Sequence, residues 1–176
     1  SYQKATGDWV IRMDLDYFFH EKDFENIRKE LGNNFDKPAV AFPKYQFFTP
    51  DRYALKTNIV IAYNKKEFPD IKLNGGPDLC LPTLNGKEIL PGDVPISKIF
   101  LWNYDSMFKT KNVISEDRAR FARAWYRYFD DWGKGEGDDP EKAFDAWFKM
   151  IKGRYKNHKK LMPIDKHPKY IKNKML

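Results

Sequence analysis

The spacing of apolar residues changes partway along this chain, and that change limits the possible folds more than any other feature. Three early segments have strand character: WVIRMD at 9–14, PAVAFPKYQFF at 38–48 and the β-branched TNIVIAY at 57–63. A helical stripe at 21–31, ended by Gly32, separates the first two. After about residue 103 the spacing becomes helical throughout. We therefore predict an α/β fold with a mixed sheet flanked by helices and a helical C-terminal region.

The later part of the chain predicts two helices, over 115–132 and 140–152. Ser115 is the expected cap of the first, and Asp139 precedes a proline at the first position of the second. The two apolar stripes, which we expect to pack into the core, are rich in aromatic residues: Ala122, Trp125, Phe129 and Trp132, then Phe144, Trp147, Phe148 and Ile151. Between the sheet and these helices, glycine and proline predict loops with short strands at best.

Composition places the chain among folded proteins with one core. It has 176 residues, of which 41% are hydrophobic and 16% aromatic, and disordered chains are poor in aromatics. The expected parts of this one domain are a sheet region at 1–100, helices packed on it at 101–162, and a basic tail at 163–176. No apolar run approaches the roughly 18 residues that span a bilayer. Cys80 is the only cysteine, which suits a reducing cytoplasm.

The net charge of +7 is concentrated near the C-terminal end. From Lys149 onward there are ten Lys or Arg residues and one acid, a net charge of +9, so the rest carries −2. Such a segment can meet an anionic membrane surface, nucleic acid or a phosphorylated ligand. The alternative is a solvated coil that serves solubility.

Two aspartates, Asp14 and Asp16, close the first predicted strand. Side chains two residues apart on a strand point to the same face, and ligands of α/β sheets bind at strand ends. Adjacent carboxylates repel unless a cation lies between them and a ligand. We predict that Asp16, with Asp14, binds Mg²⁺ or Mn²⁺, which in turn holds phosphate. A turn in which both aspartates bond backbone amides is the alternative.

Three enzyme classes place Asp-x-Asp after a hydrophobic strand. Phosphatases of the haloacid-dehalogenase type carry Thr or Val where this chain has Phe18, although Asp130-Asp131 could stand for their downstream acids. Lesion-bypass polymerases need a further carboxylate motif and a longer chain. The third class resembles this sequence best. The segments ATGDWVIRMDLDYFFHEKDFENI, LWNYDSMFKTK and HPKYIKNKML resemble motifs of GT-A-fold glycosyltransferases of the family-2 type.

That resemblance implies transfer of a sugar from a nucleotide-sugar donor to a hydroxyl of a glycan, lipid-linked or other acceptor. The metal on Asp16 and Asp14 would neutralise the leaving diphosphate. Where the family often has a metal-binding His, this chain has Asn103, a weaker oxygen ligand that we include as a third candidate. Tyr17 stands where the family often has an acid.

The general base that such a transfer needs is not fixed by a motif. We predict Asp78, in a glycine-rich turn where backbone can approach a substrate closely. Asp93 and Asp105 are rival candidates. Lys109 and Lys111 are candidates for phosphate contact.

The resemblance also implies a preceding half-sheet that binds the nucleotide base, yet only thirteen residues precede Asp14. We therefore expect the sequence to be part of a longer polypeptide that acts in the cytoplasm, at a membrane surface if its acceptor is lipid-linked. A different class of function, a non-catalytic module that binds single-stranded nucleic acid through aromatics and a basic groove, stays open at this point.

Overall fold

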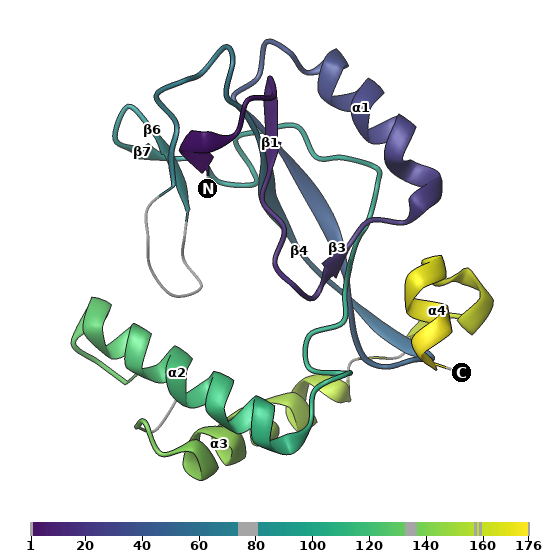
Figure 1. Cartoon of the computed structure of the whole chain (residues 1–176), viewed down its shortest axis with the longest axis vertical. Helices are drawn as coiled ribbons and strands as arrows, with labels where there is room; N and C mark the ends of the chain where they lie inside the picture. Colours follow the sequence, from purple (N-terminus) through teal and green to yellow (C-terminus); the bar gives the residue numbers. More distant parts are fainter. Residues whose placement is uncertain (1, 74–80, 133–136, 157, 159, 176) are drawn as a thin grey trace.

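The computed structural model describes residues 2–73, 81–132, 137–156, 158 and 160–175. Its centre is a curled mixed sheet in the strand order β1-β4-β3-β8-β2, with β9 added to β4 (Figure 1). The protein is therefore of the mixed α/β class, as predicted. The strands of this sheet are β1 (Trp9–Ile11), β2 (Tyr17–Phe18), β3 (Ala39–Thr49), β4 (Arg52–Asn64), β8 (Leu101–Asn103) and β9 (Lys160–Leu161).

The long hairpin of β3 and β4 forms the core of the sheet, and β3 presents different residues to its two sides. Val40 and Phe42 pack in a cluster beneath helix α1, whereas Ala41 packs on the opposite side. The pairing register shifts between Phe42 and Lys44. After this shift, Lys44 and Gln46 line a cavity. Tyr45 and Phe47 join an aromatic cluster on the other side.

Helix α1 (Phe24–Asn33) follows a short 3-10 turn, η2 (Glu21–Asp23), and together they cover the predicted range 21–31. Ile27 and Leu31 are buried against the sheet, as the stripe predicts, but Phe24 is 55% exposed. The helix also continues through Gly32 instead of ending there. The last turn stays helical because the Asn34 backbone amide donates a hydrogen bond to the Glu30 carbonyl oxygen.

Helices α2 (Lys111–Phe129) and α3 (Pro140–Tyr155) pack on each other at one end of the molecule, away from α1 (Figure 1). The start of α3 is as predicted, with the Asp139 carboxylate accepting two backbone N–H bonds. The predicted cap of α2 was wrong. Thr110 caps this helix, and Ser115 lies within its second turn, where its hydroxyl donates to the Lys111 carbonyl oxygen.

A small second sheet of β5 (Lys72–Leu73), β6 (Pro82–Leu84) and β7 (Lys87–Glu88) covers the Ala41 side of the main sheet. The β6–β7 turn is Asn85-Gly86, and both residues have positive φ, as a two-residue hairpin requires. The loop-rich prediction for this region, with short strands at best, is confirmed where the structure describes it. A further 3-10 turn, η1 (Tyr2–Lys4), opens the described chain.

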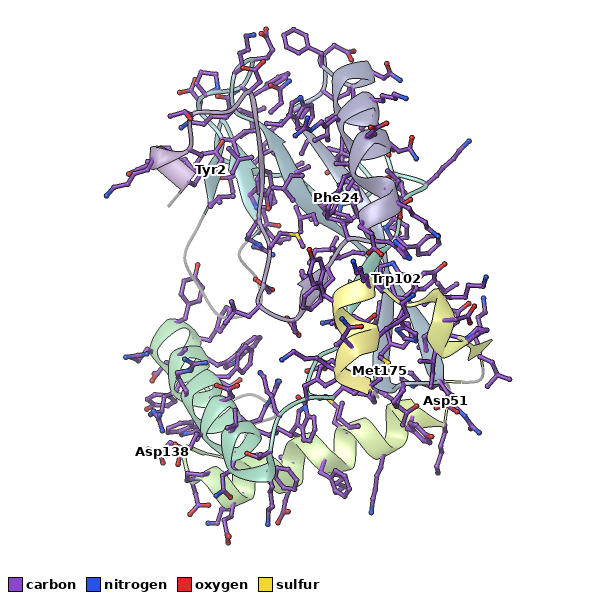
Figure 2. All side chains as sticks on the ribbon, turned by 45° about the vertical axis from the view of Figure 1, so that its right-hand side comes forward. Tyr2, Phe24, Asp51, Trp102, Asp138 and Met175 are labelled. Atoms are coloured by element: carbon purple, nitrogen blue, oxygen red, sulfur yellow. The ribbon has the colours of Figure 1, made fainter. Side chains whose placement is uncertain are left out.

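The C-terminal segment is folded against the sheet, whereas the sequence predicted coil. It contains β9, the 3-10 turn η4 (Ile164–Lys166) and helix α4 (Lys169–Met175). His167 is fully buried and its Nδ1 lies 2.9 Å from the Tyr104 hydroxyl oxygen. Trp102 on β8 and Met175 on α4 belong to the same aromatic cluster (Figure 2). None of the helices in the described part of the chain combines the length and apolarity that crossing a membrane requires.

Candidate functional site

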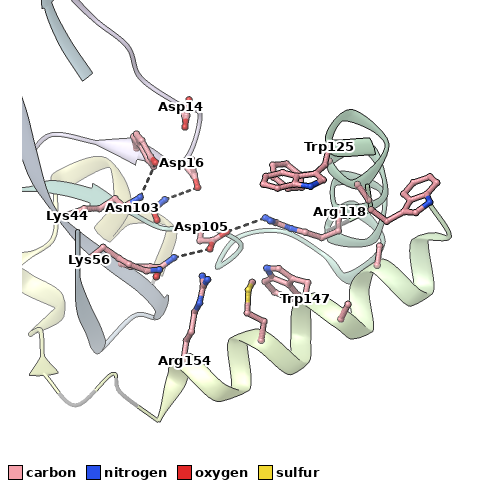
Figure 3. Close-up of a pocket in the computed structure, with 18 residues that line it drawn as sticks. Asp14, Asp16, Lys44, Lys56, Asn103, Asp105, Arg118, Trp125, Trp147 and Arg154 are labelled. Atoms are coloured by element: carbon pink, nitrogen blue, oxygen red, sulfur yellow. Dashed lines mark hydrogen bonds and ion pairs between the residues drawn. The ribbon is translucent and has the colours of Figure 1, made fainter. Parts of the chain in front are cut away.

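A cavity of about 650 Å³ lies between the Asp14–Asp16 turn, one side of the main sheet, and helices α2 and α3 (Figure 3). Three kinds of side chain line it. Carboxylates and amides come from the sheet and its loops, four cations come from the strands and helices, and most aromatic residues come from α2, α3 and the segment that follows α2. Each group is described in turn below.

The carboxylate pair lies in a turn and not at the end of a strand. Strand β1 ends at Ile11, three residues earlier than the prediction, and the Tyr17 amide donates to the Asp14 carbonyl oxygen at 3.0 Å. Asp14 is exposed and Asp16 is half-buried, and both line the cavity. The two aspartates thus lie in a turn and line the same cavity.

The strand register fixes Asp16 beside two buried amides. Tyr17 on β2 pairs with Asn103 on β8, which in turn pairs with Gln46 on β3. Residues paired across a sheet point to the same side, so all three line the cavity. Asn103 is 3% exposed, and its Nδ2 donates to Asp16 Oδ2 at 2.8 Å. Asn103 therefore orients the Asp16 carboxylate. Its role as a metal ligand stays a prediction.

The electrostatic environment of Asp16 opposes its ionisation. Burial raises the pKa of this carboxyl above its ordinary value of 3.8, and the nearby charges of Asp105 and Asp14 raise it further. Hydrogen bonds from a backbone amide and from Asn103 act in the opposite direction without cancelling the effect. Three acids therefore share a small region, and a bound cation would relieve their repulsion.

Asp105 is the third acid of the cavity and follows β8 in a left-handed conformation, with φ of 36°. This conformation is uncommon for a residue other than glycine, and aspartate adopts it more readily than most. Its carboxylate accepts hydrogen bonds from Gln46 Nε2 at 3.2 Å and from Ser106 Oγ at 3.1 Å, and it lies 3.5 Å from Arg118 Nη2. Asp105 is thus held at the centre of the cavity wall.

The structure places one of the other two candidates for the general base. Asp93 accepts a hydrogen bond from the Leu90 amide in an exposed turn and does not line the cavity. Asp78 lies outside the described residues. Of the three candidates, the described structure therefore brings only Asp105 together with Asp14 and Asp16.

The donor set permits a hard divalent cation only with outside ligands. Among the described residues, no three His, Cys, Asp or Glu side chains are grouped closely enough to hold a metal ion. Mg²⁺ commonly binds through one or two carboxylates and completes its coordination with water and substrate phosphates. Asp16 and Asp14 fit that pattern, because both are oxygen donors that face a cavity large enough for phosphate.

Four cations line the same cavity. Lys44 and Lys56 are paired across β3 and β4, and the Lys44 ammonium lies 3.0 Å from the Tyr17 hydroxyl oxygen. Arg118 comes from α2 and Arg154 from the end of α3 (Figure 3). With three acids, the net charge of the lining is +1, which favours an anionic ligand.

The lysines that the sequence suggested for phosphate contact have other neighbours. Lys109 forms an ion pair with Asp117 at 2.8 Å, and the Lys111 ammonium lies 5.2 Å from the centre of the Phe144 ring. Neither lysine lines the cavity. The acids Asp130 and Asp131, considered for a phosphatase, lie at and after the C-terminal end of α2 and are also outside the lining.

The aromatic stripes of α2 and α3 form a cavity wall where the sequence predicted core. Trp125 and Trp132 are half-buried and line the cavity, and Phe129 is 40% exposed. Trp147 also lines it, although this residue is 9% exposed and packs with Ile114 and Ile151. The stripe prediction was therefore right for the inner part of α3 and wrong for most of α2.

Sequence reasoning missed Lys44, Gln46, Arg118 and Arg154 as site residues. A partial signal existed for the first two, because polar residues alternate with aromatics in the segment KYQFF of a predicted strand. No local pattern indicates the two arginines, since their position depends on how α2 and α3 pack. Comparison of this chain with protein-family models, with curated proteins and with solved structures finds no match.

Proposed function

We propose that this chain carries the metal-binding and acceptor side of a glycosyltransferase with a GT-A-like fold, which transfers a sugar from a nucleotide-sugar donor to an acceptor hydroxyl. One observation carries the proposal. The Asp14–Asp16 turn and Asp105 face the same cavity, whose other walls are cationic and aromatic. In the proposed enzyme this arrangement would provide metal ligands, phosphate contacts, a base and a surface for a sugar within one space.

The residues divide into roles according to their position. Asp16 and Asp14 would hold Mn²⁺ or Mg²⁺, which when bound supplies charge neutralisation for the diphosphate leaving group. Lys44 and Lys56 lie on the sheet side, where they would contact the same phosphates. Asp105 is our candidate base, because it is the central carboxylate and is oriented by Gln46. Asn103 positions Asp16 through its hydrogen bond.

The alternatives find less support in the arrangement of these residues. A phosphatase of the haloacid-dehalogenase type would need Asp130 or Asp131 near the first pair, and neither lines the cavity. A module for single-stranded nucleic acid would lay a phosphate backbone along cationic and aromatic residues. Here the described aromatics line one partly open cavity and form no extended groove along which successive bases could stack.

The proposal is tested by metal and nucleotide binding. We expect the chain to bind Mn²⁺, measured by water-proton relaxation, and to bind it more tightly when UDP is present. Asp16→Asn should remove this binding, since it deletes the charge while keeping an acceptor for Asn103. Asp145→Asn is the matched control, because Asp145 is exposed on α3 and outside the cavity. Equal Mn²⁺ affinity in all three proteins would contradict the proposal.

A further inference from the structure

We propose that the α2–α3 wall of the cavity is the acceptor site, and that it binds a pyranose ring carrying a negatively charged group. Trp125 would stack on the ring, and Arg154 would bind the charged group. This inference rests on the proposed function, since it names the class of acceptor for the same cavity. It depends on residues other than the Asp14–Asp16 turn.

The α2–α3 wall and the adjoining strand β3 contain buried polar atoms that lack a hydrogen-bond partner among the described residues. Among the described residues, no hydrogen bond reaches the indole Nε1 of Trp125 or Trp147, Nε of Arg118, or Oε1 of Gln46. Three of these are donors and one is an acceptor. Leaving a buried polar group without a hydrogen-bond partner is unfavourable. Both tryptophans line the cavity, so their indole N–H groups are candidate donors to a ligand bound there.

A sugar satisfies such a mixed set better than an apolar ligand does. Every hydroxyl group both donates and accepts, so one ring can bond the indole donors, the Gln46 oxygen and the Asp105 carboxylate. The C–H faces of a pyranose are apolar and suit an aromatic surface. Trp125 offers part of that surface, because it is half-buried and lines the cavity, with Phe129 beside its ring at a centroid distance of 4.5 Å.

Trp147 is less suited to stacking than Trp125. Trp147 is only 9% exposed, whereas Trp125 is half-buried, and the Arg118 guanidinium carbon lies 5.6 Å from the centre of the Trp147 ring. Arg118 is itself held near Asp105 at 3.5 Å. We therefore assign the stacking contact to Trp125 and only the indole N–H contact to Trp147.

Arg154 gives the wall its preference for a negative charge. Arg118 has Asp105 as a counter-ion, whereas the Arg154 side chain has no hydrogen bond or ion pair with another described residue. Figure 3 shows Arg154 reaching from α3 toward the cavity, on the side of Asp105 away from Asp14. A guanidinium pairs well with carboxylate or phosphate, often through two parallel hydrogen bonds. A carboxylate or phosphate on the acceptor would supply the missing partner.

The test uses the indole N–H signals of the ¹⁵N-labelled chain, without metal. The five tryptophans give five such signals, which Trp→Phe variants assign. Glucuronate is the acidic probe and glucose is the neutral one. We expect glucuronate to shift the Trp125 and Trp147 signals saturably and to leave Trp9 and Trp102 unchanged. Glucose should shift the same signals but bind more weakly.

Two variants separate the stacking contact from the charge contact. Arg154→Gln should weaken glucuronate binding about tenfold or more and leave glucose binding unchanged, since it removes one charge-assisted contact. Arg127→Gln is the matched control, because Arg127 is exposed on α2 and outside the cavity. Trp125→Leu should weaken both sugars.

Three results would overturn the inference. The first is the absence of saturable shifts at Trp125 and Trp147 with either sugar. The second is an equal effect of Arg154→Gln and Arg127→Gln, which would mean that net charge alone attracts glucuronate. The third is displacement of glucuronate from Trp125 by uridine monophosphate without metal, which would make the wall a nucleotide site. Because Mn²⁺ binding through Asp16 is measured separately, failure of the acceptor site and failure of the proposed function are distinguishable.

Discussion

At the scale of single residues, Asp16 shows the conflict between stability and binding most clearly. Its carboxylate is partly withdrawn from water and lies near two other acids, so the fold holds it where ionisation is unfavourable. The hydrogen bond from Asn103 keeps it in place nonetheless. Unfavourable electrostatics of this kind are common at functional sites, because a ligand's charge relieves them.

We expect Asp16→Asn to raise the melting temperature at neutral pH. The folded-state pKa of Asp16 is raised, so the folded protein binds this proton more tightly than the unfolded chain. Stability is therefore lost as pH rises from 3.8 through the raised pKa, and the loss is complete above it. Asp16→Asn does not lose this stability, so the difference in melting temperature between the variant and the wild type should vanish at a pH below 3.8. Thermal unfolding followed by circular dichroism across this pH range measures the difference.

Saturating Mn²⁺ with UDP should reverse the order at neutral pH, because ligand that binds only the folded wild type stabilises it. Asp145→Asn should behave as wild type in both conditions. A melting temperature of Asp16→Asn at or below that of wild type, without metal at neutral pH, would contradict the electrostatic account.

At the scale of elements, local patterns predicted much of the secondary structure. The segment 38–48 is β3, one residue displaced, and Asp139-Pro140 starts α3 as expected. Ser115 was a misleading cap signal, because Thr110 can cap the same helix five residues earlier and the intervening residues are compatible with a helix. Sequence spacing therefore does not determine at which residue such a helix begins.

The burial of the aromatic stripes could not be predicted in the same way. Helical spacing shows that Trp125 and Trp147 share a side of their helices with other apolar residues, but it does not show what that side contacts. The packing of α2 and α3 against each other and the sheet decides it. The same packing brings Arg118 and Arg154 to the cavity that the Asp-x-Asp turn also lines, and neither α2 nor α3 carries a local signal for that.

The two tryptophans should therefore differ in their effect on stability. Trp147→Ala is expected to cost about 3–5 kcal/mol, the range for deleting a large buried aromatic, because Trp147 packs with Ile114 and Ile151. Trp125→Ala should cost clearly less, since its ring is half-buried beside the cavity. Urea unfolding of both variants gives the two free energies. Equal losses would show that Trp125 belongs to the core, as its spacing alone suggests.

At the scale of the whole molecule, positive charge is concentrated in a segment that is structurally part of the domain. The last 28 residues carry +9, yet they include the end of α3, β9 and α4. His167 is fully buried and Ile171 is 3% exposed. His167 also forms a hydrogen bond with Tyr104 in the aromatic cluster. Removing residues 163–176 would therefore unfold part of the core, and charge substitution is the better probe of this surface.

We expect the triple substitution Lys166→Gln, Lys169→Gln and Lys174→Gln to weaken binding to vesicles that contain anionic lipid. All three lysines are exposed, and each cation near such a surface contributes about 1 kcal/mol at low salt. The effect should fade as salt shortens the Debye length. Cosedimentation with phosphatidylserine vesicles and with neutral vesicles measures it.

The control variant replaces Lys4, Lys29 and Lys87 with Gln, because these lysines are also exposed but belong to other parts of the fold. Because none of these six lysines lines the cavity, Mn²⁺ binding should stay unchanged in both triple variants. Equal vesicle binding by the two variants would mean that net charge, and not this basic surface, governs the attraction.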